Sequence, residues 1–479
     1  MIKYIKKKWI FISIIAFIPI LVFISLIFKE KSKVNIIIIV IDALRKDHLS
    51  CYGYYRNTTP YIDTLAENGI LFKNCIAQSS WTLPSMASIF SSKYPSQIGV
   101  GAVADKNGMY NLQENTPSVL KEEELTLAEA FNENGYNTIS IAPNYFVSEK
   151  FGLAQGFEKK FYSRQKNAKE IVDLAINQIS EYLKKQTEEH KKKDDSPFFM
   201  YLHFMDVHVP THPPSPYNTL YPTLDNKAHN KRHHEWSFKI GESLNNQEFK
   251  EYRSHKIALY DGALNFIDSQ IGRFIKYLDT SPLNEKIIVI TSDHGEEFWD
   301  HALFEKKYYE DPRGYYGIDH GHTMFGELLE VPLIFHGKGI PEKSIEQQVK
   351  SLDIMPTILS SSGIKYKTNN IEGIDLIYKI KRNELEDSVA ITEGIAYGYE
   401  KKSIQDGKYK YINGEVELFY DKLKDPLEKR NIIKNKPKLA AQYKKVLSKF
   451  FYTIRLQEKK SVLKDEELIE ELRSLGYIK

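Results

Sequence analysis

Three side chains that can bind a metal follow two predicted buried strands of this 479-residue chain. Asp42 comes directly after the apolar run 36–41, and Asp293 and His294 come just after the run 286–291. In an α/β fold the carboxyl ends of parallel strands meet at one edge of the sheet, where binding groups gather. Carboxylate oxygens and imidazole nitrogen together are typical ligands of a divalent cation. Either aspartate alone could cap a following helix, but their joint placement favours a metal site.

A third strand-like run, 198–204, adds imidazoles to the same edge. It contains His203 and leads into Asp206 and His208. Histidine titrates near neutral pH and is therefore suited to proton transfer. His203 and Asp206 could also bind a second metal, but their spacing fits a two-metal phosphodiesterase poorly.

The stretch SSWTLPSMAS, residues 79–88, places a hydroxyl just before a proline and a run of small residues. As a structural residue, Thr82 would be the N-cap of a helix over 85–90, with Pro84 early in the first turn. As a reactive residue, Thr82 would be a nucleophile, and a helix N-terminus also suits an anionic ester. The two roles do not exclude each other.

Apolar runs that alternate with amphipathic stretches predict how these residues are positioned. The predicted strands are 34–41, 137–142, 198–204, 286–291 and 331–336, and the predicted helices are 126–134, 167–185 and 247–278. This alternation is typical of an α/β fold with a central, mostly parallel sheet flanked by helices.

Two regions depart from the alternating pattern. Residues 209–246 contain PTHPPSPY and show no clear period, which indicates a long surface insertion. From about residue 380 the predicted strands become shorter, and a charged helix follows them. We therefore expect a main domain over 34–379 and a small C-terminal α+β subdomain over 380–479.

The N-terminus carries an uncharged apolar run of 20 residues, 9–28, which is long enough to span about 30 Å of hydrocarbon as a helix. Four lysines within residues 1–8 and three lysines after the run favour a cytoplasmic N-terminus only slightly. A cleaved signal peptide is the alternative, but no small-x-small cleavage site follows the run. We expect a single-pass signal anchor, with the rest of the chain outside the cytoplasm.

The overall composition limits the classes of partner. The formal net charge is only +3 and 42% of the residues are hydrophobic, which indicates a large folded core and no nucleic-acid partner. The chain has two cysteines, Cys51 and Cys75. Their spacing does not require a disulfide, so we expect two inert thiols.

Several segments, in order, resemble the sulfatase family within the alkaline phosphatase superfamily. The resemblance begins with NIIIIVIDALRKDHLSCYGYYRNTTPYIDTLAENGILF and continues through SSWTLPSMASIFSSKYPSQIGV, HFMDVHVP, TSDHGEEFWDH, GHTMFGELLEVPLIF and ELFYDKLKDPLEKRNI. It covers nearly the whole chain after the apolar run. It implies an alkaline-phosphatase-like sandwich and a metal-dependent hydrolase that attacks a sulfate or phosphate ester through a metal-bound nucleophile.

The resemblance also implies a ligand set for one divalent metal ion. Asp42 matches the first metal carboxylate, and Asp293 with His294 matches the second pair of ligands. Thr82 occupies the position of the nucleophile, which also contacts the metal. The imidazole of His294 favours Zn²⁺ or Mn²⁺ over Ca²⁺, although Ca²⁺ and Mg²⁺ stay open.

Three histidines match positions that act on the substrate. His208 corresponds to the histidine that contacts the ester oxygens and protonates the leaving group. His320 and His322, in DHGHT, lie where many relatives place a basic group on the substrate anion. Either of the two could fill that place.

The chain departs from the family at the nucleophile. Many sulfatases carry Cys or Ser in a C/S-x-P-x-R motif that is converted to formylglycine, whereas this chain has Thr82 and Met86. Threonine cannot give that aldehyde, so no formylglycine is expected. Ala43 also replaces the second aspartate that many sulfatases have. A threonine ester must be opened by a second in-line attack on sulfur or phosphorus, as in covalent phosphoenzymes.

Three functions are compatible with these residues. The leading hypothesis is an extracytoplasmic hydrolase of sulfate or phosphate esters on a glycan, a lipid or a small molecule. The second is a membrane-anchored transferase of a phosphoethanolamine- or phosphoglycerol-type headgroup, because Thr82 resembles the nucleophile of phosphoethanolamine transferases and lipoteichoic acid synthase. The third is an inactive relative that binds anionic glycan.

Overall fold

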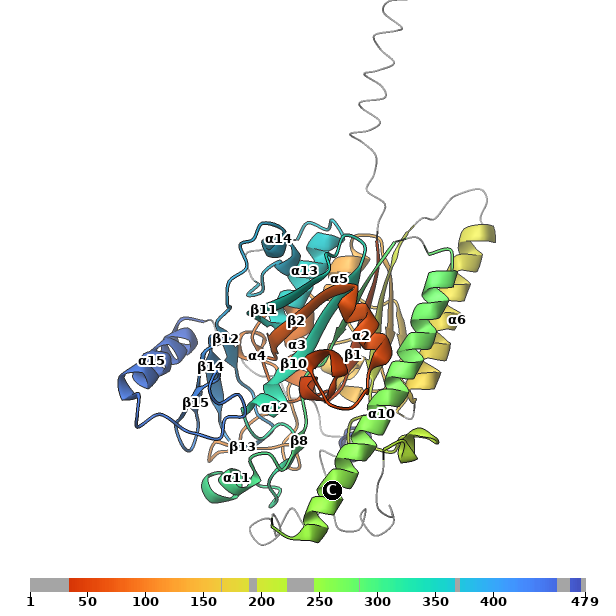
Figure 1. Cartoon of the computed structure of the whole chain (residues 1–479). Helices are drawn as coiled ribbons and strands as arrows, with labels where there is room; N and C mark the ends of the chain where they lie inside the picture. Colours follow the sequence, from red (N-terminus) through yellow and green to blue (C-terminus); the bar gives the residue numbers. More distant parts are fainter. Residues whose placement is uncertain are drawn as a thin grey trace, which may run out of the picture. The chain divides into compact units, whose positions relative to one another are not determined.

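The most apolar run of the sequence lies at the centre of an eight-stranded sheet. Strand β1 (Asn35–Ile41) is buried along its whole length, as is typical of a β-branched strand covered on both faces. The strand order is β11-β2-β10-β7-β1-β6-β4-β5, and β10 is the one antiparallel strand among these eight. The computed structural model thus confirms the predicted α/β fold with a mostly parallel central sheet (Figure 1).

The structure describes residues 34–164, 166–188, 196–221, 245–283, 285–366, 371–454 and 466–474. The predicted anchor at 9–28 and residues 222–244 of the predicted insertion lie outside these ranges. No helix within the described ranges is long and apolar enough to cross a membrane. Cys51 and Cys75 are both free thiols, as expected.

The remaining strands of the large sheet include all those that the sequence predicts. They are β2 (Gly69–Ile76), β4 (Asn137–Ile141), β5 (Lys159–Phe161), β6 (Phe198–Phe204), β7 (Lys286–Thr291), β10 (Glu330–Gly337) and β11 (Lys343–Lys350). The strands β2, β5 and β11 are not among the predicted ones; β11 is an edge strand with several exposed polar residues.

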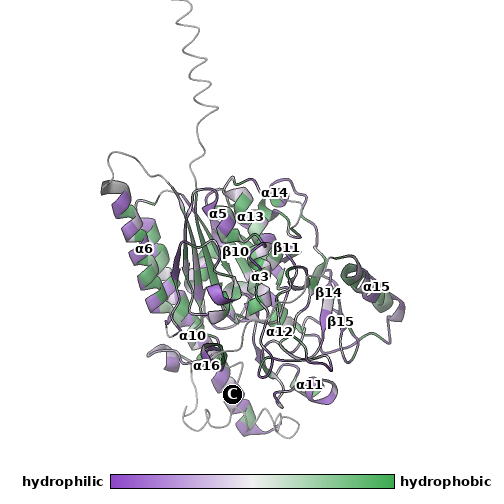
Figure 2. Ribbon diagram, turned by 180° about the vertical axis from the view of Figure 1, so that it is seen from behind, coloured by the Kyte–Doolittle hydropathy of each residue, from purple (hydrophilic) through white to green (hydrophobic). Residues whose placement is uncertain are grey.

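Helices cover both faces of this sheet (Figure 1, Figure 2). On one face α2 (Pro60–Glu67) and α6 (Ala168–Glu188) both pack against α10 (Gln247–Thr280), and on the other α3 (Thr82–Ser91), α5 (Leu127–Asn132) and α13 (Ile354–Ser361) pack together. Strand β1 divides its side chains between two cores, because successive residues point to opposite faces. Ile38 and Val40 join the core with α3 and α13, and Ile39 joins the core with α6 and α10.

A second, smaller sheet follows in the C-terminal part, where the sequence predicts short strands. Its order is β12-β14-β15-β16, formed by β12 (Ala390–Thr392), β14 (Lys402–Gln405), β15 (Tyr409–Asn413) and β16 (Leu418–Asp421). Helix α15 (Pro437–Thr453) packs against β14 and β15. The division of the chain at residue 380 stays a prediction.

The other elements are short. They are α4 (Pro95–Ile98), β3 (Met109–Asn111), β8 (Glu297–Phe298), α11 (Ala302–Tyr308), β9 (Ile318–Asp319), α12 (Gly326–Leu329), α14 (Leu376–Lys381), β13 (Tyr397–Tyr399) and α16 (Glu466–Ser474). Four of them, β8, α11, β9 and α12, lie in the connection between β7 and β10.

A buried chain of charges joins the small sheet to the large one. Lys410 of β15 lies 2.9 Å from Glu428 Oε1, and Lys422 Nζ lies 2.6 Å from the same oxygen and 2.8 Å from Oε1 of Glu330 in β10. Burial raises the pKa of Glu428, but the charges of Lys410 and Lys422 outweigh burial and hold this pKa below its ordinary value. Glu428 thus provides a negative charge beside two buried ammonium groups, those of Lys410 and Lys422.

We expect the Glu428→Gln substitution to lower the free energy of unfolding by about 3–5 kcal/mol, because it leaves the fully buried Lys410 without its counter-charge. Urea denaturation measures this loss. The matched control is Glu417→Gln, which breaks the exposed pair with Lys444 and should cost no more than about 1 kcal/mol. Equal losses in the two variants would contradict the prediction.

Candidate active site

The carboxyl ends of β1 and β7 bring Asp42, Asp293 and His294 together, because these strands are parallel neighbours. His294 Nδ1 lies 2.8 Å from the Gly295 carbonyl oxygen and donates to it, which leaves a lone pair on Nε2. This Nε2 lies 3.5 Å from Asp42 Oδ1 and 3.4 Å from Asp293 Oδ2. Both of those oxygens are buried and have no hydrogen-bond partner in the described structure.

This arrangement fits a divalent cation. Buried polar atoms normally have partners, so two orphaned carboxylate oxygens that face an imidazole lone pair require a positive charge between them. Ligands about 2.1 Å from a tetrahedral Zn²⁺ lie about 3.4 Å from one another, close to the separations at His294 Nε2. Asp42, Asp293 and His294 can therefore hold a metal ion, as the sequence predicts.

The two carboxyl groups differ in their electrostatic surroundings. Burial raises the pKa of Asp42, but the charge of His208 and the hydrogen bond and charge of His203 outweigh it, so this pKa lies well below its ordinary value. Burial also raises the pKa of Asp293, and the charge of Asp42 raises it further. Ionisation of both groups at once therefore calls for an additional positive charge.

Thr82 lies at the same place, as the first residue of α3. Its Oγ1 is 3.2 Å from His294 Nε2 and 3.5 Å from Asp42 Oδ2. The expectation that Thr82 is the N-cap is wrong, because Trp81 holds that position with extended backbone angles. Thr82 instead faces two of the candidate ligands, Asp42 and His294, from within the first helical turn. Ser85, one turn on, donates to the Asp293 carbonyl oxygen at 2.6 Å and ties the helix to the strand end.

Two further residues fix the Asp42 carboxylate. Asn144 Nδ2 donates to Asp42 Oδ2 at 2.7 Å, and His203 Nε2 lies 2.8 Å from the same oxygen. His203 therefore positions a candidate ligand and is not placed as the ligand of a second metal. The sequence does not reveal Asn144, because it lies 102 residues from Asp42 in an irregular segment.

His208 and His320 lie beside the candidate ligands. The ring centroid of His320 is 4.3 Å from that of His294 and 4.9 Å from that of His208. His208 Nδ1 lies 2.6 Å from the Val209 carbonyl oxygen, and His320 Nδ1 lies 3.3 Å from Glu296 Oε2. Burial and the charges of His294 and His208 hold the pKa of His320 well below its ordinary value.

His322 has different partners. Its Nε2 lies 3.0 Å from Glu297 Oε2 and 3.3 Å from Glu305 Oε2. Burial lowers the pKa of His322, but these carboxylates outweigh burial and raise it to about 10. Of the two histidines that the sequence leaves open, His320 is therefore the one whose ring lies against His208 and His294.

Arg45 braces the loop after β1. Arg45 pairs with Asp47 at 2.8 Å and with Asp300 at 2.7 Å, and it donates to the Glu296 carbonyl oxygen at 3.1 Å. These bonds connect the segment after Asp42 to the segment after His294.

The family model of the sulfatases matches residues 34–364. The chain belongs to the sulfatase family. It is thus a sulfatase-family hydrolase, and the acidic and imidazole groups described above fit the metal dependence of that family.

Its relatives match over most of their length. A sulfatase of Formosa agariphila is 27% identical over 86% of this chain and 86% of its own, and the Delta 4,5-hexuronate-2-O-sulfatase of Bacteroides thetaiotaomicron is 24% identical over 88% of each. The phosphonate monoester hydrolase of Agrobacterium radiobacter has a similar fold, with a TM-score of 0.65, 20% identity and coverage of 88% of this chain and 96% of that chain.

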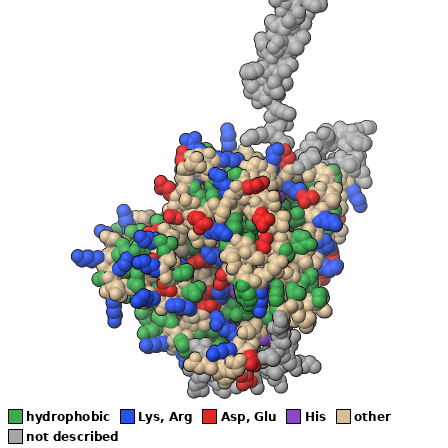
Figure 3. All heavy atoms as spheres, viewed as in Figure 1, with side chains coloured by type: hydrophobic (Ala, Val, Ile, Leu, Met, Phe, Trp, Pro, Cys, Tyr) green, Lys and Arg blue, Asp and Glu red, His purple; other side chains and the backbone are tan. Residues whose placement is uncertain are grey.

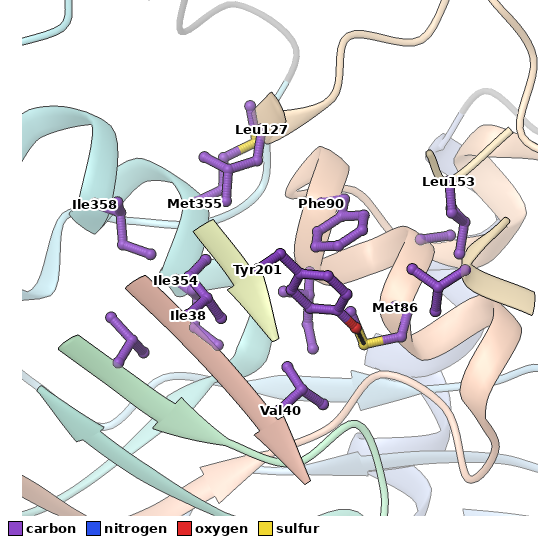
Figure 4. Packing of buried hydrophobic residues seen from close by; sticks show 14 of the residues in the cluster. Ile38, Val40, Met86, Phe90, Leu127, Leu153, Tyr201, Ile354, Met355 and Ile358 are labelled. Carbon is purple, nitrogen blue, oxygen red and sulfur yellow. Dashed lines mark hydrogen bonds between the residues drawn. The ribbon is translucent and has the colours of Figure 1, made fainter. Parts of the chain in front are cut away.

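This sulfatase-family chain fills the place of the motif arginine with a core residue. Met86 is completely buried, and its sulfur lies 3.9 Å from the Tyr201 hydroxyl (Figure 4). That hydroxyl lies 2.5 Å from His203 Nδ1. A continuous series of contacts thus runs from the apolar core to the Asp42 carboxylate, through Met86, Tyr201 and His203.

We expect His203→Gln to weaken Mn²⁺ or Zn²⁺ affinity about 10–100-fold, because loss of a partner that orients a ligand has this effect on metal sites. Competition with a chelating dye measures the affinity. His212→Gln, which changes an exposed histidine, should leave it unchanged. An unaltered affinity in the His203 variant would contradict the proposed role of His203 in positioning Asp42.

Proposed function

We propose that the chain is a metal-dependent hydrolase that cleaves sulfate or phosphate esters of an anionic glycan outside the cytoplasm, with Thr82 as nucleophile. The observation that supports it most directly is the position of Thr82 Oγ1, which faces His294 Nε2 and Asp42 Oδ2 at the start of a ten-residue helix. Amide groups and the dipole at a helix N-terminus also favour an anionic ester.

In the first step the Thr82 oxygen attacks sulfur or phosphorus and its proton leaves to solvent. A bound divalent ion would lower the pKa of the hydroxyl and offset negative charge on the ester. The bond from sulfur or phosphorus to the glycan oxygen breaks, and that oxygen takes a proton from Nε2 of His208. The Val209 carbonyl oxygen accepts from Nδ1 and orients this ring.

In the second step a water molecule attacks the same sulfur or phosphorus in line. The bond to the Thr82 oxygen breaks, sulfate or phosphate leaves, and Thr82 regains a proton from solvent. His208 takes back its proton from the attacking water. No formylglycine takes part, because threonine provides the ester oxygen directly.

The relatives support an anionic glycan as the substrate class. Two of them are described as an ulvan-active sulfatase and a Delta 4,5-hexuronate-2-O-sulfatase, and one structural neighbour is described as a 2-O GAG sulfatase. We extend this substrate class to the present chain because one part of its surface is strongly basic, although its net charge is close to neutral.

This surface extends over residues 429–454, which carry eight basic residues and no acidic one. All eight are exposed, and Figure 3 shows basic side chains gathered around α15 at its left. They are Lys429, Arg430, Lys434, Lys436, Lys438, Lys444, Lys445 and Lys449. A concentration of one charge sign attracts polymers of the opposite sign.

The small sheet connects this surface to the site. The Gly394 carbonyl oxygen, just after β12, accepts from Trp81 Nε1 at 2.7 Å, and Ala396 N donates to the Gly321 carbonyl oxygen at 2.6 Å. Trp81 precedes the proposed nucleophile and Gly321 follows His320. An anionic glycan held along α15 would therefore bind to a part of the chain that contacts both loops of the site.

We expect Thr82→Ala to reduce kcat on aryl sulfate and aryl phosphate esters by about 10⁴-fold or more, as loss of a nucleophile does in other covalent hydrolases. Thr82→Ser keeps the hydroxyl and should retain activity within about tenfold. Mass spectrometry of the wild-type enzyme before the reaction should show Thr82 as an unmodified threonine. After the reaction is quenched, the peptide that contains Thr82 should carry sulfate or phosphate.

Full turnover by the Thr82→Ala variant would exclude this nucleophile. Faster discharge of the Thr82 ester by an added alcohol than by water would identify a headgroup transferase instead. No activity on any ester, with cellular function unchanged in Thr82→Ala, would indicate an inactive glycan-binding relative.

Membrane attachment through residues 9–28 is part of the same proposal. We expect the chain to stay with the membrane after an alkaline carbonate wash, because twenty apolar residues insert stably. A C-terminal epitope should be cleaved when intact cells meet a membrane-impermeant protease. Release by the wash, or protection of the epitope until the cells are lysed, would contradict the proposed location.

A further inference from the structure

The connection between β7 and β10 carries His294 at its start and His320 near its end. Its regular elements are short, and the longest, α11, has seven residues. Long connections with so little regular structure need other contacts to hold one conformation. The conformation matters here because it determines where His320 lies.

Glu297, Glu305 and His322 meet within this connection. His322 Nε2 lies 3.0 Å from Glu297 Oε2 and 3.3 Å from Glu305 Oε2. The exposed fractions of the three residues are 1%, 0% and 4%. One ligand atom of each lies within 4.8 Å of those of the other two. The three donors resemble, in type and spacing, those of Asp42, Asp293 and His294.

Hydrogen bonds inside this cluster do not satisfy it. Glu305 Oε1 is buried and has no hydrogen-bond partner in the described structure, although Oε2 accepts from Gly317 N at 2.9 Å. A single imidazole carries at most one positive charge, and it faces two carboxylates. Burial, the charge of Glu305 and a hydrogen bond to the Glu305 side chain raise the pKa of Glu297 to about 7, because two buried carboxyl groups lie side by side.

The neighbouring guanidinium does not remove the surplus. Arg313 acts on His322 through its charge, but it lies 2.7 Å from Asp311 Oδ2 and 3.5 Å from Asp319 Oδ2. Its charge is therefore shared with two other buried or half-buried carboxylates.

We propose that Glu297, Glu305 and His322 bind a second divalent cation, of the Zn²⁺ or Mn²⁺ type. One imidazole and two carboxylates are a donor set that suits these ions, and the orphaned Glu305 Oε1 would serve as an additional ligand. This cation would act by position rather than by contact with the substrate. It would fix Glu297, which follows the His320 partner Glu296, and His322, which lies two residues after His320.

The number of cations bound per chain tests the proposal. The full chain, purified in detergent, is loaded with Zn²⁺ or Mn²⁺, dialysed against metal-free buffer and assayed by inductively coupled plasma mass spectrometry. We expect two equivalents in the wild type, one in Asp293→Asn and one in Glu305→Gln. The exposed Glu310 of the same connection provides the control, and Glu310→Gln should keep two equivalents.

One equivalent in the wild type and none in Asp293→Asn would overturn the proposal. One equivalent that survives in Asp293→Asn but not in Glu305→Gln would support this cation and contradict the metal dependence of the proposed hydrolase. If Glu305→Gln does not fold, the Asp293→Asn variant alone still tests for the second cation. Added Zn²⁺ should slow amide hydrogen exchange over residues 302–322 of this variant several-fold, and unchanged exchange would count against a second site.

Discussion

The repulsion between the carboxylates of Asp42 and Asp293 is the constraint on which the rest of the site depends. Parallel pairing of β1 with β7 forces these two groups into one buried space, where uncompensated charge is costly. The surroundings satisfy only one oxygen of each group: Asn144 and His203 bind Asp42 Oδ2, and the backbone amide of His294 binds Asp293 Oδ1. The other two oxygens are left facing His294 Nε2, so the fold itself creates the place for a cation.

The apolar core beneath the candidate metal site holds its ligands in position. Strand β6 runs beside β1, with Val40 opposite His203, so His203, which binds Asp42, lies in the same sheet. Tyr201 packs with Met86 of α3 and contacts His203 as well. The helix that presents Thr82 and the strand that orients Asp42 are therefore in contact through one packed pair (Figure 4). A charged arginine in place of Met86 would disrupt this packing, since the position is completely buried.

The sequence predicts the ligands but not what surrounds them. Asp42, Asp293 and His294 are predictable because they follow strongly apolar strands. The carboxyl ends of neighbouring parallel strands meet at one edge of the sheet, independently of the conformation of the loops. Asn144 is not predictable, because its bond to Asp42 spans 102 residues and depends on how an irregular segment folds. Strand β11 is missed because an edge strand needs no continuous apolar run. The net charge of the chain does not reveal the basic surface around α15, because acidic residues elsewhere in the sequence cancel its charge.

The choice between His320 and His322 shows why spacing alone fails at a turn. In an extended chain, residues two apart point to the same side, so both imidazoles would be expected to face one site. Gly321 between them has a φ of +79°, a conformation that glycine adopts without strain, and the chain turns there. The Gly321 amide donates to the Ser80 carbonyl oxygen and its own carbonyl accepts from Ala396, which holds the turn against the segment before Thr82. One connection can therefore direct His320 toward His208 and His294 and His322 toward a separate pair of carboxylates.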